Sequence, residues 1–162
     1  LAKEGFGEVA DIANGFVSLY RGEWVDAGLS FLSAVPILGY GATAMKLGRK
    51  VDKISGVYEN VMETGEYVGQ SKDIIKRTYQ HFKSSKGTFK SETLVSQTIH
   101  NMPGSSKLER EIYEQYLIRK KGGIGTGSLF NVKNPVGGRF DIYSTTFDNL
   151  AEQIIKKYNL PK

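Results

Sequence analysis

The sequence contains no cysteine among its 162 residues. Disulfide bonds, cysteine-ligated zinc and a thiol nucleophile are therefore excluded, and the composition is compatible with an exported protein. The amino terminus has no basic region, apolar run and small-residue cleavage site of the kind that makes up a signal peptide. The first residue is Leu1 rather than methionine, so we expect the chain to be a piece of a longer protein.

Basic residues outnumber acidic ones, and the excess is confined to the second part of the chain. Residues 1–50 carry five lysines and arginines and five acidic residues, whereas residues 51–162 carry seventeen and twelve. The net charge of +5 and both histidines therefore belong to residues 51–162. A basic domain suits a polyanionic partner, because lysine and arginine displace counterions from phosphates. The length suits one small domain with an appendage.

Residues 1–50 have the apolar spacing of helices. Within them, Ala27–Met45 contains no charged residue and is long enough for a membrane span. Glycines, serines and Pro36 interrupt this run. We therefore favour packed helices that turn at Val35-Pro36 over a stable membrane span. A membrane-active role for residues 1–50 stays open as an alternative.

Residues 51–162 alternate between β-prone and helix-prone segments. Two short β-prone runs flank Thr64-Gly65, which predicts a hairpin with glycine at the turn. An amphipathic helix that begins at Ser71 as N-cap follows, and Ser106 with Glu109 forms the capping box of another helix. We expect strands at 54–61, 66–70 and 93–100, and helices at 71–85, 106–121 and 146–158.

The expected fold class is α/β of the α+β kind. A small three-stranded antiparallel sheet would be flanked by helices and preceded by an all-helical segment. The expected domains are residues 1–50, the helical segment, and residues 51–162, the α+β domain.

The helix expected at 71–85 carries two functional candidates on its polar face. Its apolar stripe consists of Ile75, Tyr79 and Phe82. Arg77 and His81 are four residues apart, so they are neighbours on the opposite face, which we expect to point away from the core. Arginine presents a planar fork of donors to phosphate oxygens, and histidine can relay protons.

Tyr58 and Tyr67 lie on the two runs of the expected hairpin, directly before this helix. Tyrosine hydroxyls can orient a water or relay a proton, so two tyrosines beside Arg77 and His81 form a constellation suited to phosphoryl transfer. Each element also has a structural explanation, because tyrosine is common in strands and an Arg–His pair is often a solvated helix face. The ordered combination favours a functional site.

The order Gly56-Val57-Tyr58, eight residues, Tyr67-Val68-Gly69, then Arg77 and His81 resembles the opening of a GIY-YIG nuclease domain. Such a domain would span residues 54–135. The resemblance implies hydrolysis of phosphodiester bonds, with DNA as the default substrate and RNA left open. By this resemblance Tyr58, helped by His81, orients or deprotonates the attacking water. Arg77 holds the non-bridging oxygens, and Tyr67 positions the phosphate.

The same resemblance supplies a metal ligand. GIY-YIG nucleases have a glutamate on a helix with a Leu-Ile pair and an asparagine shortly afterwards, and Glu114, Leu117-Ile118 and Asn131 are similar to that arrangement. Glu114, which we expect on a polar helix face, would hold one Mg²⁺ or Mn²⁺ ion, and Asn131 would brace the site. A glycine-rich stretch lengthens the spacing to Asn131, so Asn134 is the alternative. Glu111 is interpreted as a solvent-exposed charge.

Residues 22–46 resemble the pre-toxin modules that precede the toxic end of bacterial polymorphic toxins, through a Gly-x-x-x-Asp-Ala…Leu-Ser…Pro…Gly pattern. The resemblance implies a secreted antibacterial nuclease that acts in the cytoplasm of a target bacterial cell. It also implies a cognate immunity protein, which we expect to be acidic. The alternative is a basic module that binds nucleic acid or protein without turnover.

Overall fold

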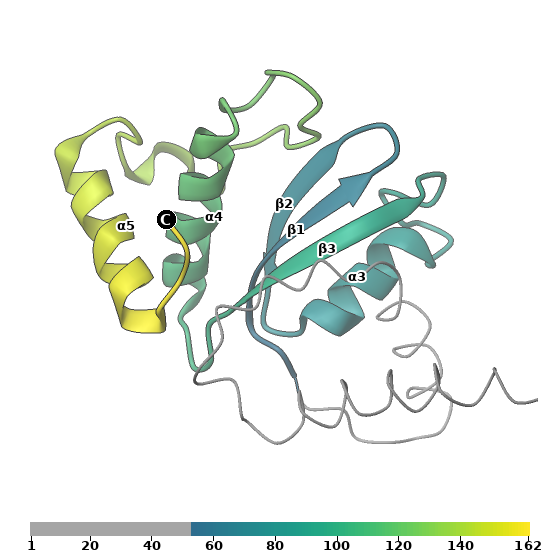
Figure 1. Ribbon diagram of the computed structural model, residues 1–162, viewed down its shortest axis with the longest axis horizontal. Helices are drawn as coiled ribbons and strands as arrows, with labels where there is room; N and C mark the ends of the chain where they lie inside the picture. Colours follow the sequence, from purple (N-terminus) through teal and green to yellow (C-terminus); the bar gives the residue numbers. More distant parts are fainter. Residues whose placement is uncertain (1–52) are drawn as a thin grey trace, which may run out of the picture.

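The structure is a computed structural model that describes residues 53–162. The helical segment expected over residues 1–50, with its turn at Val35-Pro36, lies outside the described residues. Within them, three antiparallel strands and three α-helices form an α+β fold, as the sequence predicts (Figure 1).

The sheet consists of β1 (Gly56–Met62), β2 (Glu66–Ser71) and β3 (Leu94–Asn101), in the order β2-β1-β3. All three expected strands are therefore confirmed, with bounds that differ by at most two residues. The central strand β1 places Tyr58 opposite Gly69 of β2 and Ile99 of β3. One edge of the sheet is β2, and that edge becomes part of the candidate site.

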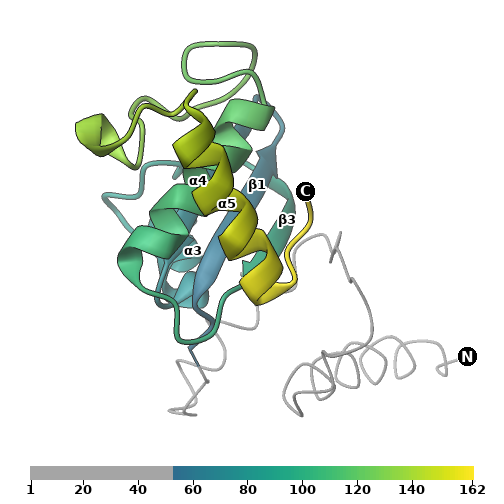
Figure 2. The same cartoon turned by 90° about the vertical axis from the view of Figure 1, so that its left-hand side faces the viewer.

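The two faces of the sheet are covered by different helices (Figure 1). Helix α4 (Lys107–Lys120) lies on the face of Val57 and Val68, and α5 (Thr145–Tyr158) packs against α4 on the side away from the sheet (Figure 2). Helix α3 (Ile74–Phe82) lies on the opposite face, which carries the side chain of Tyr58. The smaller core on that side consists of Met62, Phe82, Phe89 and Leu94.

Helix α4 begins as the sequence predicts. The side chain of Ser106 accepts the backbone N–H of Glu109 at 3.1 Å, and the Glu109 carboxylate accepts the backbone N–H of Ser106 at 2.7 Å. This reciprocal pair satisfies two backbone donors at the helix start. At the other end, Gly122 and Gly123 adopt positive φ angles, which glycine tolerates best, and the chain leaves the helix there.

The start of α3 differs from the prediction. Ser71 is the last residue of β2, and the N-cap is Asp73, whose side chain accepts the backbone N–H of Lys76 at 3.0 Å. Both residue types cap helices well, and the strand pairing of Ser71 with Gly56 decides between them.

The buried face of α3 is also rotated relative to the prediction. It consists of Ile74, Thr78, His81 and Phe82 rather than Ile75, Tyr79 and Phe82. Two polar side chains are buried because each has a partner on the sheet. Thr78 accepts a hydrogen bond from Gln97 at 2.8 Å, and His81 contacts Tyr58. His81 therefore does not point away from the core, as expected, and only 6% of it is exposed.

Helix α4 is fixed to the sheet near both ends. At its start, the buried Arg110 donates to the backbone oxygen of Ser105 at 2.7 Å and to the side chain of Gln70 on β2 at 2.9 Å. After its end, the Lys121 ammonium lies 2.9 Å from Glu59 of β1 and 2.6 Å from Glu66 of β2. These contacts fix where the residues between them lie relative to β2.

Gly69 allows the hairpin to pack closely. A Cβ atom at this position would lie 2.6 Å from Cζ and from the hydroxyl oxygen of Tyr58, and 2.7 Å from Cε1 of Tyr67. No side chain fits there without displacing both rings. Steric contacts alone therefore explain why glycine stands at the end of the Tyr-Val-Gly motif, independently of any activity.

We predict that Gly69→Ala lowers the free energy of unfolding by about 1–3 kcal/mol, the usual cost of forcing a methyl group into a packed site. Gly138→Ala is the matched control, because a Cβ atom there meets no atom within 4 Å. Urea denaturation of the two variants measures the difference. Equal unfolding midpoints would contradict the packing described here.

Candidate active site

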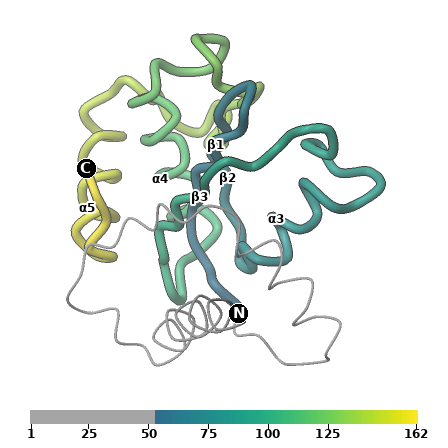
Figure 3. Tube along the Cα trace, turned by 45° about the vertical axis from the view of Figure 1, so that its right-hand side comes forward, coloured from purple at the N-terminus to yellow at the C-terminus, as the bar shows by residue number. Residues whose placement is uncertain are grey.

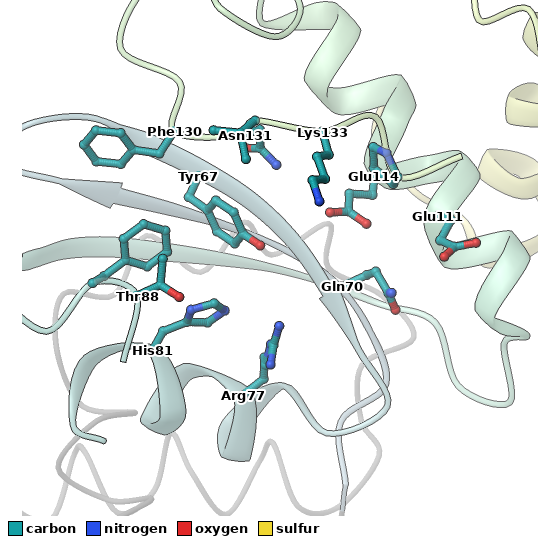
Figure 4. A pocket seen from close by; sticks show the side chains of 13 residues that line it. Tyr67, Gln70, Arg77, His81, Thr88, Glu111, Glu114, Phe130, Asn131 and Lys133 are labelled. Atoms are coloured by element: carbon teal, nitrogen blue, oxygen red, sulfur yellow. The ribbon is translucent and has the colours of Figure 1, made fainter. Parts of the chain in front are cut away.

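A cavity of about 350 Å³ lies between α3, the edge strand β2, α4 and residues 130–135, which follow the glycine-rich residues 122–128. Figure 4 shows Arg77 and His81 entering it from α3, Tyr67 from β2, and Glu114 from α4. Four of the six residues proposed from the sequence therefore share one cavity with Asn131, the fifth. Only Tyr58 is absent from the lining.

Tyr58 is buried behind the cavity rather than in it. None of it is exposed, and its hydroxyl lies 3.1 Å from Nε2 of His81. Tyr67, which does line the cavity, has its ring 5.4 Å from the His81 ring between centroids. Tyr58 thus contacts the imidazole through its hydroxyl and Tyr67 through its ring, and of the two tyrosines only Tyr67 lines the cavity.

Burial keeps the aromatic groups of the site uncharged. Burial, followed by the positive charge of Arg77, lowers the pKa of His81 to about 4, so the imidazole is neutral at pH 7. Burial also raises the pKa of Tyr58 and of Tyr67 above the usual value for tyrosine, although Arg77 opposes the shift in both. At neutral pH the site therefore has protonated hydroxyls and a neutral imidazole that can accept a proton.

Glu114 is buried, contrary to the expectation of a polar helix face, and only 7% of it is exposed. Burial, with a smaller contribution from the charge of Glu111, raises its pKa to about 8, while Arg77 acts in the opposite direction. α4 is buried along most of its length, because the sheet covers one side of it and α5 another. Glu114, which has the sequence pattern of a surface charge, is therefore buried by the packing around α4.

Asn131 continues the edge of the sheet with its side chain. Its amide oxygen accepts the backbone N–H of Val68 at 2.9 Å, and its amide nitrogen donates to the backbone oxygen of Val68 at 2.8 Å. The amide thus pairs with β2 as a neighbouring strand would, and it holds residues 130–135 against the cavity. Asn134, the alternative, instead accepts a hydrogen bond from Gln115 at 3.1 Å beside a second, smaller cavity.

The structure adds cavity residues that the sequence analysis did not propose. Glu111 lines the cavity three residues before Glu114 and forms ion pairs with Lys107, at 3.4 Å, and with Arg139. Its helical spacing from Glu114 is the signal that could have identified it. Lys133 lies with its ammonium toward Glu114 in Figure 4. Nothing in the sequence around Lys133 distinguishes it from a surface lysine.

The carboxyl groups of the cavity suit a hard divalent cation that takes only one or two of its ligands from the protein. Residues 53–162 contain no cluster of three or more metal-ligating side chains. Mg²⁺, however, is commonly held by one or two carboxylates together with waters and substrate phosphates. Glu114 fits that role, because burial disfavours its charged form and a bound cation would stabilise that form. Glu111 lines the cavity beside it.

Comparison of the chain with models of protein families, with curated proteins and with solved structures found no match. Among residues 53–162, no helix has both the length and the apolar character needed to cross a membrane.

We predict that Glu114→Gln stabilises the protein increasingly as pH rises. Because the folded-state pKa of Glu114 is about 8, above the ordinary 4.5, the folded protein binds more protons than the unfolded chain between these values. The contribution of Glu114 to stability therefore falls as pH rises through this window. The melting temperature of the variant minus that of the wild type should grow by at least about 4 °C between about pH 5 and pH 8.5.

The exposed Glu152 on α5 supplies the control, since Glu152→Gln should give a difference that does not change with pH. Millimolar Mg²⁺ at high pH should raise the melting temperature of the wild type and leave that of Glu114→Gln unchanged. A pH-independent difference for Glu114→Gln would show that the carboxylate is solvated.

Proposed function

We propose that this protein is a metal-dependent nuclease that hydrolyses phosphodiester bonds, with DNA favoured over RNA. The observation that carries the proposal is the cavity itself. It gathers Arg77, His81, Tyr67 and Glu114, which come from three separate elements of the chain. A cationic fork, a neutral base, a hydroxyl and a buried carboxylate facing one space are the groups that hydrolysis of a phosphodiester needs.

Arg77 and Tyr67 bind and orient the phosphate in this proposal. The exposed Arg77 guanidinium presents paired N–H donors to the non-bridging oxygens, and its charge offsets the negative charge that builds in the transition state. The Tyr67 hydroxyl is protonated at neutral pH, and burial raises its pKa further, so it can donate a hydrogen bond to the phosphate.

His81 and Tyr58 handle the proton of the attacking water. The neutral imidazole of His81 accepts a proton, and Tyr58 fixes its orientation through the 3.1 Å contact. Tyr58 therefore acts as a positioning residue, whereas the sequence-based hypothesis had it act on the water directly. Glu114 would hold Mg²⁺ or Mn²⁺, and the bound cation would offset charge on the phosphate and the leaving oxygen.

We predict that Arg77→Ala and Glu114→Gln each reduce cleavage of supercoiled plasmid DNA by at least about 100-fold, the usual loss when a transition-state contact is removed. EDTA should abolish cleavage by the wild type. Agarose-gel assays with plasmid DNA and with tRNA, each with Mg²⁺ or EDTA, measure both effects and identify the preferred substrate.

Lys156→Ala and Glu152→Gln, both at exposed positions of α5, are the controls, and both should cleave at the wild-type rate. Circular dichroism establishes that each variant is folded. Full activity of either site variant in folded form would refute the mechanism. Nucleic-acid binding without any cleavage by the wild type would favour the non-catalytic binding module instead.

A toxic role is the second part of the proposal, and it depends on the resemblance of residues 22–46 to pre-toxin modules. The protein would be secreted and would act in the cytoplasm of a target bacterial cell, and an acidic immunity protein would cover the cavity in the producer. Opposite charges would speed that association, so its rate should fall with added salt.

We predict that expression of the whole chain in a bacterium without the immunity protein arrests growth, and that Glu114→Gln relieves the arrest. Colony counts after induction measure the effect, with immunoblots to establish equal protein levels. Arrest by both proteins together with dye leakage from vesicles would favour the membrane-active alternative. Normal growth with abundant soluble wild-type protein would argue against a toxin.

A further inference from the structure

The net positive charge of the chain is confined to one short stretch. Residues 72–90, here called the basic segment, contain six lysines and arginines and one acidic residue. The rest of residues 51–162 contains eleven of each, and residues 1–50 contain five of each. The basic segment therefore carries the whole net charge of +5.

The positive charges of the basic segment form no ion pair within residues 53–162. Its five lysines, like Arg77, are exposed, at positions Lys72, Lys76, Lys83, Lys86 and Lys90. The ion pairs within residues 53–162 all lie elsewhere, mainly on α4 and α5. Asp73, the only acidic residue of the segment, is engaged as the cap of α3.

The basic segment also borders the cavity. It comprises α3 and the turn that follows, and it contributes Arg77, His81, Thr88 and Phe89 to the lining. Lys83 is the C-cap of α3 and follows Lys76 by seven residues, about two helical turns, so the two lie along the same side of the helix. They are separated by about 10 Å along the axis, a length over which one DNA strand places about three phosphates.

α4 and α5 present a different surface. Lys107, Arg119 and Lys157 each form an ion pair with a carboxylate, so their charges are largely compensated. Figure 3 shows α3 and the turn after it on the side of the molecule away from α5. On α4, on α5 and in residues 130–135, the exposed lysines that form no ion pair are Lys120, Lys156 and the cavity residue Lys133. The unpaired positive charge around the cavity is therefore densest on the basic segment.

We propose that the basic segment is the nucleic-acid-binding surface, so that a strand whose phosphate lies at Arg77 continues across α3 and the following turn, and not across α4 and α5. This inference rests on the proposed function, because it states where the substrate of that site lies. Phosphate contacts by these lysines would release counterions, which makes binding depend on salt.

The test is binding of fluorescein-labelled duplex and single-stranded DNA to the whole chain in EDTA, followed by anisotropy from about 50 to 200 mM NaCl. The variant is Lys76→Gln/Lys83→Gln/Lys86→Gln. The control is Lys120→Gln/Lys156→Gln/Lys162→Gln, which removes the same charge from α4, α5 and the carboxyl terminus. For the duplex, the slope of log affinity against log salt should become shallower by about 2.7 in the variant, and by less than about 1 in the control.

Equal losses in the two triple variants would overturn the inference, as would a wild type that binds neither DNA. An unchanged slope in the Lys76/Lys83/Lys86 variant would also overturn it and would favour an acidic protein as the partner of the basic segment. Plasmid cleavage by the same proteins in Mg²⁺ separates the two proposals. Binding through the basic segment without cleavage would retain this inference and reject the nuclease. Cleavage with an unchanged slope would retain the nuclease and reject binding through the basic segment.

Discussion

The close pairing of Tyr58 with Gly69 is the constraint on which the site depends. The β1–β2 ladder places these residues opposite each other, and the missing side chain at Gly69 leaves space for both tyrosine rings. Tyr58 can then cross the face of the sheet and reach His81 at 3.1 Å. That contact sets the rotation of α3, and the rotation in turn directs Arg77 to the cavity (Figure 4). A larger residue at Gly69 would disturb the whole arrangement.

Burial determines the electrostatics of the cavity. It shifts the pKa of His81 down to about 4 and that of Glu114 up to about 8, so both shifts favour the uncharged form at neutral pH. Arg77 is the charged group that acts on both. In the proposed function, an anionic phosphate would enter a space in which Glu114 is largely uncharged, and a bound cation would restore the carboxylate charge.

The groups that position the site differ in burial and pairing from the exposed lysines beside it. Arg110 and Lys121 fix α4, and Asn131 fixes the segment along β2, so Glu114 is positioned by contacts from distant parts of the chain. These holding groups are largely buried or paired. The lysines of residues 72–90 are exposed and unpaired within the described part of the chain, which leaves their charge available to a polyanion.

Local patterns in the sequence determined the three strands, the capping box of Ser106 and Glu109, and which residue types would form the site, because alternation, capping and turn residues act over a few neighbours. Only the tertiary structure decided that His81 and Glu114 are buried, that Tyr58 lies behind the cavity, and that Asn131 rather than Asn134 borders it. The one-residue choice between Ile74 and Ile75 as the buried position of α3 has the same origin. Burial and hydrogen-bond partners come from residues far apart in the chain, and no local pattern contains them.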